Sequence, residues 1–97
     1  MQKSPSSETA ADWCVYLLLC ENGALYCGIA KDAAKRFAAH KAGKGAKYTR
    51  MHKPQQMRVV ADKLDKSNAS AWEAQIKKMS RAEKEKWWAE GLVVETV

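Results

Sequence analysis

Arg36 and His40 are four residues apart in a segment predicted to be helical, and this spacing puts both side chains on one helix face. The planar, permanently charged guanidinium of Arg36 suits the oxygens of a phosphate group. The imidazole of His40 is able to relay a proton or to bind the phosphate. Two simpler alternatives stay open, namely an exposed ion pair between Asp32 and Arg36 and an ordinary surface histidine. The pair alone favours these simpler alternatives, and phosphate chemistry is favoured only in combination with the two tyrosines of a predicted hairpin, Tyr16 and Tyr26.

Glu73 is the candidate metal ligand. Mg²⁺ and Mn²⁺ prefer oxygen ligands, and one carboxylate together with a substrate phosphate is able to hold either ion. Glu73 lies beside Trp72 and three residues before Ile76, at the apolar boundary of a predicted helix, which favours a carboxylate facing a cleft. The alternative is a surface glutamate paired with Lys77. Zinc is disfavoured, because the three cysteines have no CxxC spacing.

Positive charge is concentrated in the middle of the chain. The 97 residues include 17 Lys and Arg and 11 Asp and Glu, a net charge of +6. Residues 31–58 hold nine of the basic residues and one acidic residue, which is typical of a protein that binds a polyanion. A solvated basic surface without a partner is the open alternative. The candidates to hold a nucleic-acid backbone are Lys31, Lys44, Lys47, Tyr48, Arg50, Lys53 and Arg58.

Two tyrosines, Tyr16 and Tyr26, lie on a predicted β-hairpin. A three-residue turn closed by Gly23 in the left-handed conformation would pair Tyr16 with Gly28. This register puts both tyrosines on one face of the sheet and leaves open space opposite Tyr16. A two-residue Asn-Gly turn would instead put the tyrosines on opposite faces. The turn therefore decides whether the two phenols act together.

The elements that must position these residues are short and few. Asp32 and either Ser67 or Asn68 are candidate N-caps, and Ser80 with Glu83 has the form of a capping box. The pattern predicts an α/β (α+β) fold with a small three-stranded mixed sheet flanked by helices, in the order β-β-α-β-α-α. The predicted strands span residues 13–19, 24–29 and 56–61, and the predicted helices span residues 33–41, about 68–79 and 81–90.

The length predicts one domain over residues 12–97, preceded by a disordered leader over residues 1–11. No apolar run is long enough to span a bilayer, and the N-terminus lacks the apolar core of a secretory signal. Three cysteines without a disulfide framework suggest a reducing compartment. We therefore expect a cytoplasmic protein with no membrane partner.

The hairpin resembles the paired motifs of the GIY-YIG nucleases. The first motif stands here as CVY over residues 14–16, and the second stands as YCG over residues 26–28. The chain departs from the family at three motif positions and has no late asparagine, whereas both tyrosines and the last glycine are present. The resemblance is closest to the small stand-alone bacterial members and covers about residues 13–88, including Arg36, His40, residues 45–50 and Glu73.

The resemblance implies a metal-dependent DNA endonuclease that hydrolyses phosphodiester bonds and leaves a 5′-phosphate and a 3′-hydroxyl. It implies Tyr16 as general base and Tyr26 as the residue that orients the water or shares its proton. It also implies that Arg36 and His40 act on the phosphate, and that Glu73 binds one Mg²⁺ or Mn²⁺. The pKa of a free tyrosine is about 10, so nearby cations must make the role of Tyr16 feasible.

A compact basic groove with aromatic side chains favours single-stranded, flapped or branched DNA over plain duplex. The alternative is a nucleic-acid-binding module that keeps the fold but does not cut, and whose binding survives the loss of Glu73. A third reading is a basic assembly protein with no affinity for nucleic acid.

The basic segment should dominate affinity for DNA. Replacing Lys44, Lys47 and Arg50 together should weaken binding to all sequences by a similar factor and flatten the salt dependence, because fewer counterions are released. Fluorescence anisotropy over a range of salt concentrations measures both quantities. Unchanged affinity would show that the basic segment is only a solvated surface.

Overall fold

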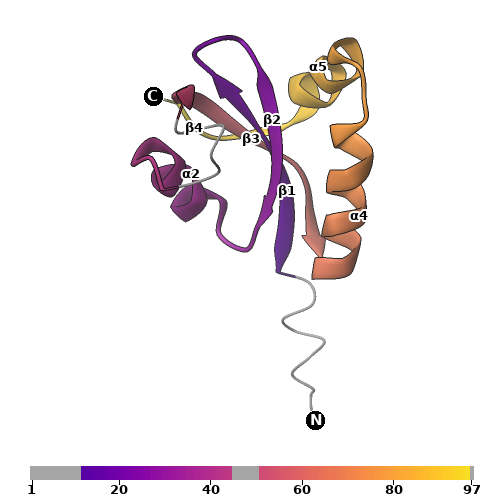
Figure 1. Cartoon of the computed structure of the whole chain (residues 1–97). Helices are drawn as coiled ribbons and strands as arrows, with labels where there is room; N and C mark the ends of the chain where they lie inside the picture. Colours follow the sequence, from indigo (N-terminus) through magenta and orange to yellow (C-terminus); the bar gives the residue numbers. More distant parts are fainter. Residues whose placement is uncertain (1–11, 45–50, 97) are drawn as a thin grey trace.

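The computed structural model describes residues 12–44 and 51–96, and within these residues it contains one four-stranded antiparallel sheet and three helices. The strand order is β2-β1-β3-β4. Helix α2 lies on one side of the sheet, and α4 and α5 lie on the other (Figure 1). The elements are β1 (Trp13–Cys20), β2 (Leu25–Ala30), α2 (Ala33–Lys41), β3 (Pro54–Leu64), α4 (Lys66–Lys77), α5 (Arg81–Glu90) and β4 (Leu92–Thr96).

The hairpin of β1 and β2 has the predicted three-residue turn. Gly23 has a φ of +86°, the left-handed conformation that glycine adopts without steric cost. The ladder pairs Tyr16 with Gly28 and Leu18 with Tyr26. Tyr16 and Tyr26 consequently share one face of the sheet, which confirms the predicted register and excludes the two-residue turn.

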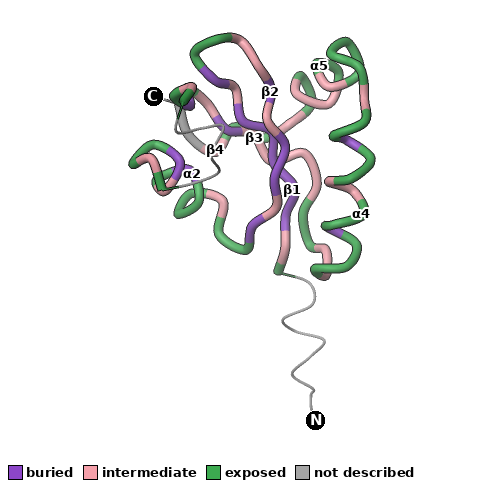
Figure 2. Tube along the Cα trace, in the orientation of Figure 1, coloured by how far each residue is buried: buried purple, intermediate pink, exposed green. Residues whose placement is uncertain are grey.

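Strand β1 is the centre of the core and is buried on both faces (Figure 2). Because side chains alternate along a strand, Val15 and Leu17 pack in the cluster that includes residues of α4. Tyr16 and Leu18 pack in a second cluster, which includes Phe37 of α2. The sheet therefore separates two apolar layers, one under each set of helices.

The prediction of a three-stranded mixed sheet was wrong in two respects. A fourth strand, β4, follows α5 and pairs with β3. Gly91 permits this approach, because a Cβ at that position would lie 3.0 Å from the Cβ of Arg58. All pairings between neighbouring strands are antiparallel. Strands β2 and β3 run parallel to each other, but β1 lies between them, so they do not pair. Strand β3 is also longer than predicted, with Lys63 at a φ of +58° near its end.

Side-chain caps explain where the helices begin. Asp32 caps α2 as predicted, with its Oδ1 accepting the Lys35 backbone N–H at 3.1 Å. The predicted capping box of Ser80 and Glu83 is present at α5. Helix α4 begins earlier than predicted, because Asp65, and not Ser67 or Asn68, is its N-cap.

The three cysteines are buried in the hairpin and none is in a disulfide. Burial raises the pKa of the Cys14 and Cys20 thiols and raises the pKa of Cys27 to about 12. Across residues 12–44 and 51–96, no helix is both long and apolar enough to cross a membrane.

Arg58 of β3 contacts Trp88 of α5 and so stabilises the packing of this helix on the sheet. Its guanidinium lies 4.4 Å from the centre of the Trp88 ring and donates a hydrogen bond of 2.9 Å to the Trp88 carbonyl oxygen. Its Nε donates a further bond of 2.8 Å to Gln56. Both the side chain and the contacts are partly shielded from water, so they contribute to stability.

Arg58→Ala should lower the free energy of unfolding by about 2 kcal/mol, because it removes charged hydrogen bonds and a cation–π contact together. Arg81→Ala is the matched control, since the ion pair of Arg81 with Glu85 is exposed and its loss should cost less than about 0.5 kcal/mol. Urea unfolding of both variants measures the difference. Equal, small losses would contradict the assigned role.

Candidate active site

Tyr16 and His40 form a buried hydrogen-bonded pair between β1 and α2. The phenolic oxygen lies 2.8 Å from Nε2 of His40, and each residue is only 1% exposed. The pair spans 24 residues of sequence and is placed by the packing of Phe37 against the sheet. The structure thus brings together the first motif tyrosine and the helix histidine, as the sequence predicted.

Burial and Arg36 set the protonation of this pair. Desolvation raises the pKa of Tyr16 to about 12, and a hydrogen bond from the Arg36 guanidinium acts in the opposite direction. Desolvation, followed by the charge of Arg36, lowers the pKa of His40 to about 4. Both groups are therefore neutral at pH 7. Arg36 can only donate, so the phenol is the acceptor in that interaction, and the direction of the Tyr16–His40 bond follows from the tautomer of His40.

Gly28 supplies the space that the Tyr16 ring occupies. A Cβ built on Gly28 would lie 2.6 Å from Cζ of Tyr16, closer than any real contact. The Tyr16 side chain therefore lies against the backbone of β2, where any side chain at position 28 would displace it. This explains physically why a glycine follows the second tyrosine at this spacing.

Tyr26 and Glu73 are linked through Lys77. The Tyr26 ring lies 6.0 Å from the His40 ring and 5.9 Å from the ammonium of Lys77. That ammonium is 3.3 Å from Oε2 of Glu73 on α4. Both tyrosines, which share one face of the sheet, therefore lie beside the His40 ring. Glu73, in contrast, lies on the other side of the sheet, next to Cys27, and reaches the site only around the β2 edge.

Glu73 fits a divalent ion only as a single ligand. Its side chain is 23% exposed, so its carboxylate is open to solvent on one side. Among the described residues, no group of three or more His, Cys, Asp or Glu side chains is arranged to hold a metal ion. One carboxylate with water and phosphate oxygens suits Mg²⁺ or Mn²⁺ but not zinc. The ion pair with Lys77, the predicted alternative, is also present.

The candidate nucleic-acid contacts are dispersed. Lys31, Lys44 and Lys53 are exposed, although Lys31 and Lys53 lie near opposite ends of the sheet. Arg58 points to the α5 side, away from Tyr16, and its guanidinium is engaged by Trp88. The structure therefore does not bring Arg58 together with the others. Lys47, Tyr48 and Arg50 lie outside the described residues.

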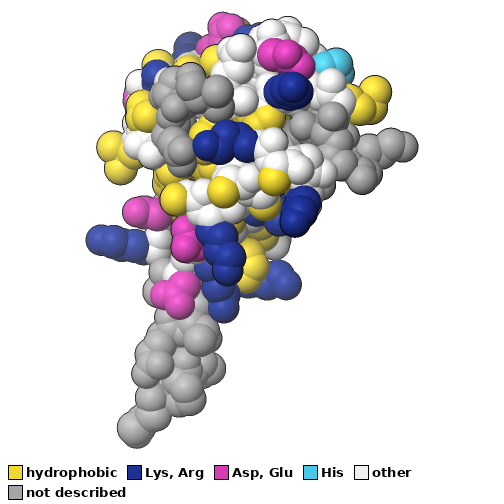
Figure 3. Space-filling view, turned by 90° about the vertical axis from the view of Figure 1, so that its left-hand side faces the viewer, with side chains coloured by type: hydrophobic (Ala, Val, Ile, Leu, Met, Phe, Trp, Pro, Cys, Tyr) yellow, Lys and Arg dark blue, Asp and Glu magenta, His cyan; other side chains and the backbone are white. Residues whose placement is uncertain are grey.

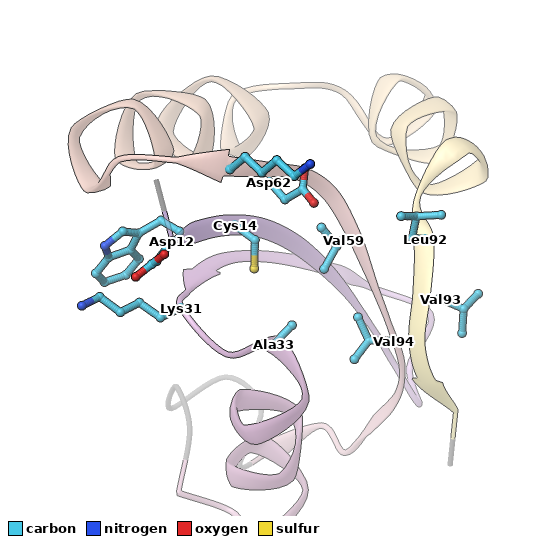
Figure 4. A pocket seen from close by; sticks show the side chains of 11 residues that line it. Asp12, Cys14, Lys31, Ala33, Val59, Asp62, Leu92, Val93 and Val94 are labelled. Atoms are coloured by element: carbon cyan, nitrogen blue, oxygen red, sulfur yellow. The ribbon is translucent and has the colours of Figure 1, made fainter. Parts of the chain in front are cut away.

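Two cavities flank the N-terminal end of β1. One is a groove of about 590 Å³ that extends from Trp13 to Arg36 and Lys35 on α2. The other, of about 410 Å³, has the Cys14 sulfur and the side chains of Val59 and Val94 pointing into it (Figure 4). Lys and Arg side chains are frequent on the lower half of the α2 side, with fewer acidic ones among them (Figure 3).

Sequence reasoning missed two features of this surface. Lys77 appeared only as a possible partner of Glu73, yet it also lies over Tyr26. Trp13 appeared only as the first residue of a buried strand, yet it is half-buried and lines the groove beside Arg36. Its position at the very start of the strand, next to charged residues 12 and 31, was the available signal.

Comparison with known proteins gives consistent matches over most of the chain. Residues 12–86 match the family model of the GIY-YIG catalytic domain. A UPF0213 protein of Neisseria meningitidis serogroup A is 53% identical over 79 residues, which cover 81% of this chain and 87% of that protein. One from Xanthomonas axonopodis pv. citri is 45% identical, covering 77% and 74%. The solution NMR structure of a UPF0213 protein from Bacillus halodurans is 34% identical, with coverage of 79% and 81% and a TM-score of 0.44.

The neutral, buried His40 should make the protein less stable in acid. Its pKa of about 4 lies below the unfolded value of 6.5, so the unfolded chain binds the proton more readily. The stabilisation is complete above pH 6.5 and declines as the pH falls to about 4, by at most about 3 kcal/mol. Chemical unfolding at each pH measures this loss. His40→Gln should flatten the profile in this window, and an unchanged slope would contradict the assignment.

Proposed function

This chain belongs to the GIY-YIG family, whose domain is in general that of a nuclease, and we propose that it is a metal-dependent endonuclease that hydrolyses phosphodiester bonds in DNA. The observation that carries the proposal is the 2.8 Å contact between Tyr16 and His40, with Arg36 at the same phenol. A buried phenol hydrogen-bonded to a neutral imidazole is able to transfer a proton, and the guanidinium of Arg36 beside it is able to bind a phosphate.

Tyr16 acts as the base through His40. As the attacking water forms its bond to phosphorus, its proton passes to the phenolic oxygen while the phenolic proton passes to Nε2 of His40. Substrate binding favours this transfer, because a phosphate paired with Arg36 offsets the charge that helps lower the pKa of His40. The bond from phosphorus to the 3′ oxygen breaks, and this oxygen takes a proton from solvent, so the products are a 5′-phosphate and a 3′-hydroxyl.

Arg36 and Tyr26 position the substrate. The exposed guanidinium of Arg36 donates to non-bridging phosphate oxygens and stabilises the extra charge of the transition state. Tyr26 lies beside His40 and is only partly buried, and its role is to orient the attacking water. Neither role requires a rearrangement of the hairpin.

Glu73 is the residue that would hold Mg²⁺ or Mn²⁺. A bound divalent ion would supply charge stabilisation and a more acidic water. Lys77 competes with the ion for the carboxylate, so the ion pair of 3.3 Å has to loosen when metal binds. Half of the Lys77 side chain is exposed, so it is free to turn toward solvent.

Single-stranded, flapped or branched DNA is the proposed substrate. The groove beside Arg36 is open and basic, and it is short compared with a duplex site. Incubating labelled single-stranded, duplex and branched DNA with Mg²⁺ or Mn²⁺, and separately with EDTA, tests activity and substrate class together. No cleavage of any substrate would overturn the proposal.

The ion pair of Glu73 and Lys77 is the one observation that favours a rival function, a nucleic-acid-binding module that does not cut. In that case Glu73 has only a structural partner and no metal. The rival predicts no cleavage by the wild-type protein or by either variant described next, whereas the proposed function predicts cleavage that only Glu73→Gln abolishes.

Glu73→Gln should abolish metal-dependent cleavage and change stability by less than about 1 kcal/mol, because the lost ion pair joins residues four apart on one helix and is only partly buried. DNA affinity should persist, since the basic groove is intact. Lys77→Met is the matched control: it breaks the same ion pair but keeps the carboxylate, so cleavage should remain. Circular dichroism, anisotropy and cleavage on each preparation measure these effects. Full cleavage by Glu73→Gln would exclude Glu73 as the essential ligand.

A further inference from the structure

We infer that Trp13, flanked by Lys31 and Lys66, is a stacking platform for one unpaired base of the nucleic-acid strand whose phosphate is held at Arg36. This inference rests on the proposed function, because it takes the strand bound at Arg36 as its ligand. It assigns a binding role to two side chains, Trp13 and Lys66, that lie outside the catalytic set.

Two ammonium groups meet at the Trp13 ring. Nζ of Lys31 lies 5.7 Å from the ring centre, and Nζ of Lys66 lies 5.5 Å from it. The lysines come from different parts of the chain, Lys31 just after β2 and Lys66 at the start of α4. Both lysines are exposed, whereas the tryptophan is half-buried. The two ammonium groups therefore lie beside a ring that is partly open to solvent. When a base stacks on the ring, the lysine side chains are able to turn toward the phosphates of the bound strand.

The ring and Arg36 belong to one groove. Trp13, Lys31, Lys35 and Arg36 line the same hollow of about 590 Å³, a volume in the range of about 300–1,000 Å³ that is usual for ligand sites. Its one acidic residue, Asp32, uses its carboxylate to cap α2. The groove therefore has an excess of positive charge between an aromatic ring and the phosphate-binding guanidinium.

This combination selects an unpaired base. Sequence-independent recognition of single strands uses a positive groove together with aromatic rings on which bases stack. In a duplex the bases are already paired and stacked, so Trp13 would gain no base there. The second cavity is also lined by Trp13, but its floor is apolar and its rim balances Asp12 and Asp62 against Lys31 and Lys63, so it has no excess of positive charge.

The test measures binding in EDTA, so that no strand is cut, with a labelled single strand of about twelve nucleotides and with the same sequence as duplex. Trp13→Leu keeps an apolar side chain but removes the flat ring, and it should weaken single-strand binding by at least about tenfold. Trp13→Phe should retain most of the affinity. Duplex binding should stay unchanged in both variants, and equal losses for the two substrates would overturn the inference.

Oligonucleotides with a single abasic site, scanned along the strand, give an independent readout. The wild-type protein should lose affinity when the base at one position is removed, and Trp13→Leu should be insensitive to that removal, because ring and base form one contact. Additive losses, or no sensitive position, would overturn the platform. If the leucine variant does not fold, Lys66→Gln should weaken single-strand binding and reduce its salt slope, whereas exposed Lys86→Gln should not.

Cleavage is measured separately with metal present. Wild-type protein that shows the Trp13 effect but cuts no DNA would contradict the proposed function and leave the platform standing. Wild-type protein that cuts DNA, with single-strand affinity indifferent to Trp13, would contradict the platform alone.

Discussion

The missing side chain at Gly28 is the constraint on which the site depends. Opposite residues in an antiparallel pair have Cβ atoms only about 4.5–5.5 Å apart, so a larger residue would take the place of the Tyr16 ring. With glycine there, the phenol lies against β2, and its oxygen reaches both His40 and Arg36. The Tyr16 ring also packs in the apolar cluster that includes Phe37 of α2. The packing of the hairpin against α2 and the proposed proton transfer therefore depend on one contact.

The sheet divides the site between two layers. The side chains proposed to bind phosphate and transfer the proton lie on the α2 side of the sheet, whereas Glu73 belongs to α4 on the far side. The two sets meet at β2, an edge strand, where Lys77 lies over the Tyr26 ring. A substrate that engages both sets has to pass over this edge. The groove beside Arg36 is lined by Ile29 and Ala30 of β2, so its basic surface borders the same edge strand.

Local rules predicted much of this arrangement. The turn closed by Gly23, the register of Tyr16 with Gly28 and the cap at Asp32 all follow from neighbouring residues. Contacts between distant residues were not accessible in this way. Strand β4 depends on the close approach of Gly91 to β3. The sequence does not distinguish Arg58 from the other basic residues, because its partner Trp88 is 30 residues away along the chain. The layer in which Glu73 lies likewise depends on the path of α4 around the sheet.

The cysteines of the hairpin react slowly with alkylating agents and oxidants, because their thiols are buried. Thiolate is the species that reacts with alkylating agents and oxidants, and with pKa values raised by burial very little of it exists at neutral pH. Cys20 and Cys27 are 1% and 2% exposed, so their thiols react only after the strand has opened to water. The rate of alkylation at these positions therefore measures local opening of the hairpin that carries both tyrosines. Resistance to oxidation and rigidity of the site have the same origin.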